Sequence, residues 1–220
     1  MTDFGKESCI MNASKVLILC PHTDDGDLGA GGTIARFIEE GKEVYYAAFS
    51  ACELSLPSGL SKDAIMLEFW EAVKILGIAV ERTTVFDYEV RSFPLHRQQI
   101  LENMVVLNDR IKPDMVIVPS SNDLHQDHHV VYSEALRAFK GTSSIWGYEH
   151  PWNNVTFTTD IFVKLETKHL NIKLNALKQY KSQRSRAYMD SKFIKSLAYT
   201  RGVQSGSKYA EAFELVRLLI

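Results

Sequence analysis

The sequence predicts an α/β fold in which helices flank a mostly parallel sheet in a Rossmann-like arrangement. Short apolar segments alternate with longer segments of helical spacing, which is typical of parallel βαβ units. The first two predicted helices each end at a glycine, the residue preferred just past a helix C-terminus. No repeat or linker-like segment divides the 220 residues. We therefore expect a single domain over residues 1–220, with a helical C-terminal segment.

The first half of the chain begins with a buried strand and a polar turn at residues 21–27. After this turn, apolar residues recur at helical intervals until Gly41, and a second such segment ends at Gly77. In chain order, we expect a strand over 15–20, a helix from 28 to 41, a strand over 43–49, a helix over 61–76 and a weak strand over 84–86.

The second half continues the alternation. Pro94 suits the first turn of a helix, and the polar loop 119–128 separates a buried strand from the next amphipathic helix. We expect a helix over 94–111, a strand over 114–118, a helix over 130–141, a strand over 145–149, an antiparallel strand over 161–165, and helices near 168–182, 189–201 and 207–219.

Composition narrows the class of partner. The chain has 25 basic and 27 acidic residues, so it has no broad positive field of the kind that attracts nucleic acid or anionic lipid. Cys9, Cys20 and Cys52 form neither a metal-binding pair nor a disulfide framework. The N-terminal apolar segments are too short for a signal peptide or membrane anchor. We expect a cytoplasmic protein that acts on a small molecule.

Two polar segments each follow a predicted strand and precede a helix. They are Pro21–Asp25 and His125–His128, and both fall at the carboxyl edge of the sheet, where open α/β folds bind ligands. His22 and Asp25 are close enough in a tight turn to converge on one point, and His128 would supply a third ligand. Two histidines and a carboxylate, with an open position for water, suit catalytic zinc and also Fe(II).

The remaining polar residues of these segments fit roles in hydrolysis. Asp24 could act as the base that takes a proton from water as it attacks an amide carbonyl. His125, held by Asp127, could stabilise the oxyanion or donate a proton to the leaving amine.

Each segment also has a purely structural interpretation. His22 and Asp25 could cap the helix that begins near Leu28, and residues 125–129 could form a solvated loop with an acidic helix start. The metal interpretation is favoured because both segments fall at strand carboxyl ends and together complete a ligand set. Three histidines stand alone and are interpreted as surface or hydrogen-bonded residues: His96, His150 and His169.

The two segments resemble the motifs of the PIG-L/LmbE-like N-deacetylases, which use zinc to remove acetyl groups from molecules that contain N-acetylglucosamine. Pro21–Asp25 with Gly31-Gly32 resembles the family's opening PHPDDE…GG motif, and Pro113 to His128 resembles its P-D…HPDH segment. Weaker matches support the resemblance at Glu68, Ala72, Leu76-Gly77, Ala176-Leu177, Tyr180, Ser182-Gln183 and residues 209–214.

This resemblance implies a Rossmann-like fold with zinc on His22, Asp25 and His128. It also implies Asp24 as general base and His125, supported by Asp127, as acid or oxyanion stabiliser. The chain departs from the family pattern in three places. Thr23 replaces the usual Pro, Gly26 replaces the usual Glu, and an Arg that commonly precedes the mid-chain Glu is missing, with Ile65 and Met66 nearby. If that Arg contacts substrate in relatives, the substrate here differs.

We therefore expect a zinc-dependent N-deacetylase that acts on an N-acetylated amino sugar, either free or linked to a nucleotide or lipid. Two alternatives stay open: an amidase that cleaves a larger sugar amide, and a sugar- or nucleotide-binding module without turnover. The module is disfavoured because Asp24 is retained and the first turn lacks GxGxxG. The apolar tail 213–220 suits either a homo-oligomer contact or a helix docked on its own core.

Substrate-side residues are expected in loops at the same sheet edge. Glu53, after the second strand, could contact sugar hydroxyls. Tyr148 and Trp152 combine aromatic faces with polar tips, which suits carbohydrate, although such residues also pack within cores.

Overall fold

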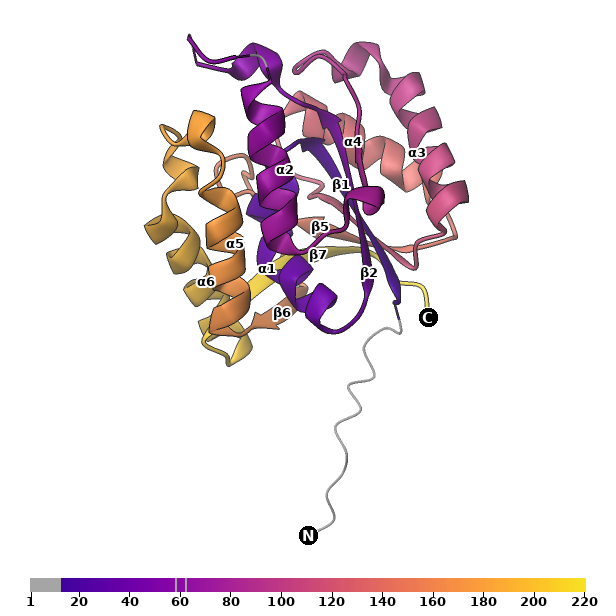
Figure 1. The fold of residues 1–220 in the computed structure, drawn as a ribbon. Coiled ribbons are helices and arrows are strands. Elements are labelled where there is room, and N and C mark those ends of the chain that lie inside the picture. Colours follow the sequence, from indigo (N-terminus) through magenta and orange to yellow (C-terminus); the bar gives the residue numbers. More distant parts are fainter. Residues whose placement is uncertain (1–12, 58, 62) are drawn as a thin grey trace.

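Seven strands form one sheet in the computed structural model, which describes residues 13–57, 59–61 and 63–220. Their order across the sheet is β3-β2-β1-β4-β5-β7-β6 (Figure 1). The strands are β1 (Lys15–His22), β2 (Glu43–Ser50), β3 (Thr83–Val85), β4 (Met115–Pro119), β5 (Ser144–Tyr148), β6 (Ile161–Leu165) and β7 (Tyr209–Arg217). The α-helices are α1 (Asp25–Glu39), α2 (Ala64–Leu76), α3 (Arg97–Ile111), α4 (Gln126–Ala138), α5 (Thr167–Leu177) and α6 (Ser191–Ser205).

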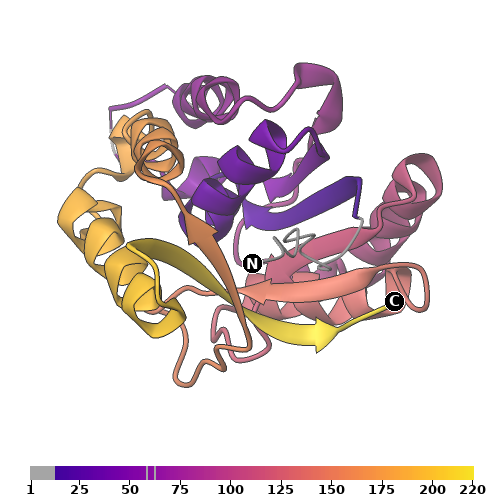
Figure 2. The ribbon, with the colours of Figure 1, turned by 90° about the horizontal axis from the view of Figure 1, so that it is seen from below.

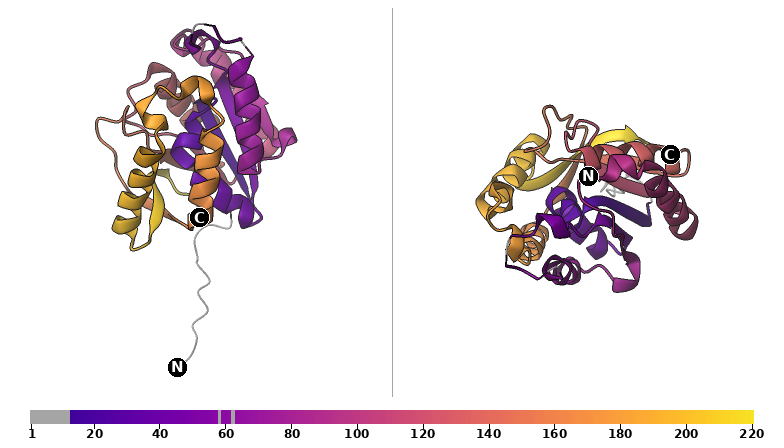
Figure 3. Two further views of the ribbon diagram at one scale, coloured as in Figure 1. Left: turned by 60° about the vertical axis from the view of Figure 1, so that its left-hand side comes forward. Right: turned by 90° about the horizontal axis from the view of Figure 1, so that it is seen from above.

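The first five strands are parallel to one another, and β6 and β7 add antiparallel pairs at one side. Helices α3 and α4 cover one face of the sheet, while α1, α2 and α5 cover the other (Figure 2). The further views in Figure 3 place α5 and α6 side by side next to α1, in agreement with the contacts between α5 and both helices. The predicted α/β fold with a mostly parallel sheet is confirmed.

The central strand β1 shows why the sheet is buried on both faces. Val16, Ile18 and Cys20 point into the core beneath α1, α2 and α5, and the alternate residues Leu17 and Leu19 point into the core beneath α3 and α4. A strand covered on both faces is apolar at every position rather than at every second one. This run ends at the first polar segment.

The predicted helix over 207–219 is wrong, because Tyr209–Arg217 forms strand β7. Its Ala, Glu and Leu residues favour a helix locally. However, β7 lies between β5 and β6 and pairs with both, and such pairing outweighs local propensity. The other two predicted C-terminal helices are confirmed as α5 and α6, and Gly206 ends α6 in a left-handed conformation with φ 65°.

Two helices begin earlier than expected. Helix α1 begins at Asp25 rather than Leu28, and α4 begins at Gln126 rather than Val130. The polar segments therefore provide the first turns of these helices, whose backbone N–H groups lack partners within the helix. Gly77 ends α2 with φ 86°, as the sequence predicts.

Other expectations bear on the environment of the protein. Cys20 and Cys52 are buried free thiols, and Cys9 lies outside the described residues. Within the described ranges, none of the helices combines the length and the apolar character needed to span a bilayer.

Candidate metal centre

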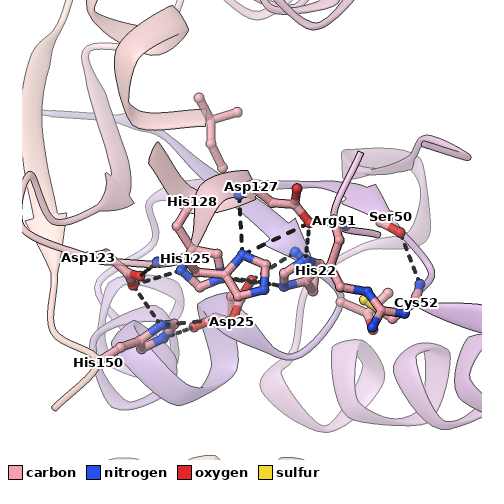
Figure 4. A network of polar contacts seen from close by, with 12 residues as sticks. His22, Asp25, Ser50, Cys52, Arg91, Asp123, His125, Asp127, His128 and His150 are labelled. Atoms are coloured by element: carbon pink, nitrogen blue, oxygen red, sulfur yellow. Dashed lines mark hydrogen bonds and ion pairs between the residues drawn. The ribbon is translucent and has the colours of Figure 1, made fainter. Parts of the chain in front are cut away.

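The two polar segments meet where β1 and β4, which are neighbours in the sheet, reach their carboxyl ends. His22 is the last residue of β1, and Asp25 opens α1. His125 caps α4, with Asp127 and His128 in its first turn. Residues about 100 positions apart in the chain thus lie in one cluster (Figure 4).

Three donor atoms form a small triangle. Asp25 Oδ2 lies 3.1 Å from His22 Nδ1 and 3.2 Å from His128 Nε2, and these two nitrogens are 3.3 Å apart. Donor atoms held at about 2.0–2.1 Å from a tetrahedral zinc lie about 3.3–3.4 Å from one another. The triangle therefore has the size and the chemistry of a site that could bind a metal ion.

A second carboxylate lies behind each histidine. Asp127 Oδ2 is 3.0 Å from His22 Nε2, and Asp123 Oδ2 is 2.7 Å from His128 Nδ1. Each ring thus has a carboxylate on the nitrogen that faces away from the triangle. This arrangement fixes ring orientation and tautomer in metal sites and makes the inner nitrogen a better ligand.

Asp127 is itself held by backbone donors. Its carboxylate accepts the N–H of Arg91 at 2.6 Å and that of Phe93 at 3.3 Å. Arg91 adopts a left-handed conformation with φ 71°, which is unusual for a residue other than glycine and is often found near functional sites. The 86–95 segment therefore helps to position His22 through Asp127.

Imidazole rings and carboxylates of opposite charge face one another in the cluster. Burial lowers the pKa of both imidazoles, but the Asp25 carboxylate and the carboxylate behind each ring outweigh it, raising the pKa of His22 to about 9 and that of His128 to about 10. Burial opposes ionisation of Asp25, yet the two imidazolium groups hold its pKa well below the usual range. The carboxylates of the cluster thus attract positive charge, which either protons on the imidazole rings or a metal ion can supply.

Asp24 differs from Asp25 in its surroundings. It is half-buried and lines the cavity above the cluster, and its side chain makes no hydrogen bond within the described residues. Burial and the neighbouring Asp25 carboxylate raise its pKa to about 6. A carboxylate with such a pKa can both take and release a proton near neutral pH.

His125 contacts Asp127 through the backbone of that residue. Its Nδ1 accepts the backbone N–H of Asp127 at 3.2 Å, whereas the Asp127 carboxylate is 4.0 Å away and contacts His22 instead. Burial and the charges of His128 and His22 lower the pKa of His125 to about 4. The ring is therefore neutral at pH 7 with its proton on Nε2.

A cavity of about 240 Å³ opens above the cluster. It is lined by His22, Asp24, Asp25, Leu28, Cys52, Ile65, Val90, His125, His128, Trp152, Asn153, Gln183, Arg186 and Tyr188. Of the three predicted substrate-side residues, only Trp152 lies in this wall. Glu53 lines a neighbouring cavity of about 550 Å³. Tyr148 is fully buried and its hydroxyl donates to the Leu19 carbonyl at 3.3 Å, so it does not reach the cavity.

Comparison with known proteins identifies this arrangement. The family model for PIG-L, described as GlcNAc-PI de-N-acetylase, matches residues 17–139, more than half of the chain and both polar segments. The chain belongs to the PIG-L family. It is thus an N-deacetylase, a hydrolase that cleaves amide bonds, in a family that acts on N-acetylated sugars.

Individual relatives with deacetylase names support the assignment to the PIG-L family. The chain is 28% identical to the uncharacterized deacetylase YaiS of Escherichia coli K12, over 76% of this chain and 90% of YaiS. It is 25% identical to the diacetylchitobiose deacetylase of Thermococcus kodakarensis, over 97% of this chain and 87% of that protein. The solved structure of the N,N'-diacetylchitobiose deacetylase of Pyrococcus horikoshii shares the fold, with a TM-score of 0.79 and 23% identity over 94% of this chain and 85% of the other.

His150 also lies in this PIG-L site, although it was not predicted there from the sequence. His150 follows β5 and is fully buried, with Nε2 3.1 Å from the Asp25 carbonyl oxygen and Nδ1 3.6 Å from Asp123 Oδ2. Its Nδ1 has no hydrogen-bond partner within the described residues. Because β5 lies beside β4 in the sheet, the position of His150 directly after a strand was the available signal. Asp25, His128 and His150 form a second group of potential ligands, and His22, His125 and His128 a third.

The departure from the PIG-L motif at Gly26 has a packing cause. A Cβ at this position would lie 2.6 Å from Cys20 Sγ and 2.7 Å from the Tyr46 hydroxyl oxygen. The Tyr46 hydroxyl donates to the Thr23 carbonyl at 3.0 Å and thereby supports the turn that carries Asp24. Glycine is therefore required where other members have a longer side chain.

Proposed function

We propose that this protein is a zinc-dependent N-deacetylase that hydrolyses the acetyl amide of an N-acetylglucosamine-type sugar. The observation that carries the proposal is the triangle of His22 Nδ1, Asp25 Oδ2 and His128 Nε2, with edges of 3.1–3.3 Å, at the base of a cavity that also contains Asp24. The names of the two diacetylchitobiose deacetylases support an N-acetylated sugar as substrate.

His22, Asp25 and His128 would hold the metal. When bound there, zinc lowers the pKa of a water molecule and polarises the amide carbonyl; Fe(II) also suits this donor set. The triangle is preferred to the two other groups of potential ligands because each of its histidines has a carboxylate on the outer ring nitrogen, whereas His125 and His150 are held by backbone groups.

Asp24 is proposed as the general base. Its carboxylate lines the cavity, makes no hydrogen bond within the described part of the chain and has a pKa raised to about 6. At neutral pH it is mostly ionised and can take the proton of the attacking water. The same proton can then pass to the leaving amine, because an acid with this pKa releases it readily.

His125 is proposed to stabilise the oxyanion that develops on the acetyl carbonyl. Its neutral ring accepts the Asp127 amide on Nδ1, so Nε2 carries the hydrogen that can be donated. A donor that is already fixed in place stabilises the transition state without reorganisation. Asp127 would contribute through both its amide, which holds His125, and its carboxylate, which orients His22.

The size of the cavity suits a single sugar ring. At about 240 Å³, it is smaller than the roughly 300–1,000 Å³ typical of sites for drug-sized ligands. One pyranose ring with its acetamido group is a suitable occupant, and Trp152 is the predicted sugar-side residue that lies in the wall. Linkage of the sugar to a nucleotide or lipid, homo-oligomer formation and a cytoplasmic location remain predictions.

A substrate panel tests the proposal. We expect the zinc-loaded protein to release amine from N-acetylglucosamine derivatives and from diacetylchitobiose. Matched N-propionyl and N-butanoyl sugars should react progressively more slowly. Faster release from the longer amides would favour the amidase, and binding of the sugars without release of any amine would contradict the deacetylase.

A further inference from the structure

The turn after α5 forms part of the cavity wall, and it is held there by α2. The two short 3-10 turns Lys181–Gln183 and Ala187–Met189 lie between α5 and α6. The Ser182 backbone N–H and hydroxyl donate to the Glu68 carboxylate at 3.0 Å and 2.6 Å. Gln183 is buried and lines the cavity one residue later. The position of this segment over the site is therefore fixed by hydrogen bonds.

Arg186, in the same segment, brings a positive charge to the cavity. Among the described residues, it is the only Lys or Arg in the cavity wall. Its guanidinium has no ion pair with a carboxylate and no side-chain hydrogen bond in the described part of the chain. A guanidinium presents a planar set of donors that matches carboxylate and phosphate oxygens. Arg186 is exposed, so its guanidinium is open to a ligand that enters the cavity.

An aromatic stack lies beside Arg186. The His150 and Trp152 rings stack with centroids 4.6 Å apart, and the Trp152 and Tyr188 rings stack at 4.4 Å. Trp152 and Tyr188 line the cavity together with Arg186. Because the two faces of Trp152 are covered by His150 and Tyr188, its edge and the outer face of Tyr188 are left for the apolar face of a sugar ring. A ring held there is limited in how it presents its substituents to the guanidinium.

The neighbouring cavity has the opposite charge. It shares Cys52 and Val90 with the cavity above the metal cluster. Its wall contains Glu53, Asp87 and Glu89, and no Lys or Arg among the described residues. An anionic substituent is therefore disfavoured there and favoured next to Arg186.

We propose that Arg186 makes this enzyme selective for amino sugars that carry an anionic substituent, a phosphate or a carboxylate. The ring lies along the outer face of Tyr188 and the edge of Trp152, its acetamido group faces the metal cluster, and its anionic group contacts the Arg186 guanidinium. The inference rests on the proposed function for the identity of the ring, but the selectivity can be measured as binding, without turnover.

Calorimetric titration of the zinc-loaded protein tests the proposal. Every sample carries Asp24→Asn, so that ligands bind without being hydrolysed. The ligands are N-acetylglucosamine, its 1-phosphate and 6-phosphate, and N-acetylmuramic acid, so that phosphate and carboxylate are compared. We expect at least one anionic ligand to bind about tenfold or more tightly than the neutral sugar. Arg186→Gln should remove this difference, and Arg186→Lys should keep part of it. Arg184→Gln is the matched control, because Arg184 is exposed like Arg186 and lies in the same segment, but does not line the cavity.

Two results would overturn the inference. In the first, every anionic ligand binds with an affinity no higher than that of the neutral sugar. The other is a loss in Arg186→Gln that is equal for neutral and anionic ligands, or no loss at all. Acetate release by the protein with Asp24 intact is measured separately. Selective binding of anionic ligands without acetate release would contradict the proposed deacetylase function but support the selectivity. Acetate release without selective binding would support the deacetylase function and contradict the selectivity.

Discussion

The carboxylate of Asp127 lies 3.0 Å from Nε2 of His22, so the other ring nitrogen faces Asp25 and His128. Asp123 has the same relation to His128, at 2.7 Å. The triangle of donor atoms is therefore supported from behind by two buried carboxylates, and its geometry does not depend on the two histidines alone.

Replacement of Asp127 tests this support. The neutral amide in Asp127→Asn lacks the negative charge that orients His22 and accepts the backbone N–H groups of Arg91 and Phe93. Zinc affinity should therefore fall about 10–100-fold. Competition with a chromophoric chelator measures the effect. Asp109→Asn, an exposed change on α3, is the control and should leave affinity unchanged. Equal affinities for Asp127→Asn and the unaltered protein would remove Asp127 from the metal site.

Replacement of Asp24 separates proton transfer from metal binding. Asp24→Asn should retain one zinc per chain, while kcat falls about 10²–10⁴-fold because the base is lost. In the unaltered protein, kcat/KM should decrease as the pH falls below about 6, where Asp24 becomes protonated. A pH profile of both proteins checks this. Full activity in Asp24→Asn would show that the base lies elsewhere.

Metal binding should release protons. In the metal-free protein the pKa of His22 is raised to about 9 and that of His128 to about 10, so both rings are protonated at pH 7. Zinc binds the neutral rings and must displace close to two protons, so its apparent affinity should rise with pH up to about 10. Calorimetry in two buffers of different ionisation enthalpy counts the protons. Binding without proton release would contradict the charge state inferred for the cluster.

A buried ion pair within the core should stabilise the first turns of α1. The Lys173 ammonium donates to the Leu28 carbonyl and to Glu211, both at 2.6 Å. Glu211 in turn accepts the N–H groups of Gly32 and Thr33. Lys173→Met leaves Glu211 buried without its partner and should lower the free energy of unfolding by about 3–5 kcal/mol.

Urea unfolding measures this change in free energy. Lys178→Met, at an exposed position after α5, is the matched control and should change stability by less than about 0.5 kcal/mol. A similar small effect for Lys173→Met would mean that the ion pair contributes little.

Patterns within short segments of the sequence predicted the strands next to the site and the residues of the donor triangle. The apolar segment before His22 and the segment before the second motif identified two strands, and a parallel sheet places their carboxyl ends together. The spacing of His22 and Asp25 and the placement of His128 then indicated a ligand set. These inferences needed no knowledge of distant contacts.

The rest depends on tertiary contacts that a single sequence does not reveal. His150 is distant from both motifs and enters the site only because β5 pairs with β4. Residues 209–217 form a strand because β5 and β6 flank them, against their local helical preference. Gln183 and Arg186 reach the cavity through the hydrogen bonds between Ser182 and Glu68. The matches at Glu68 and Ser182-Gln183 supported a family resemblance, but they did not predict this contact.

The most direct test of the central claim is metal content measured together with acetate release. The comparison uses the unaltered protein, His22→Ala, His128→Ala and His150→Ala, each after chelation and zinc restoration. We predict one zinc and restored acetate release in the unaltered protein, retained zinc in His150→Ala, and loss of both zinc and release in His22→Ala and His128→Ala. Stoichiometric zinc in His22→Ala or His128→Ala, or acetate release that persists without metal, would contradict the account.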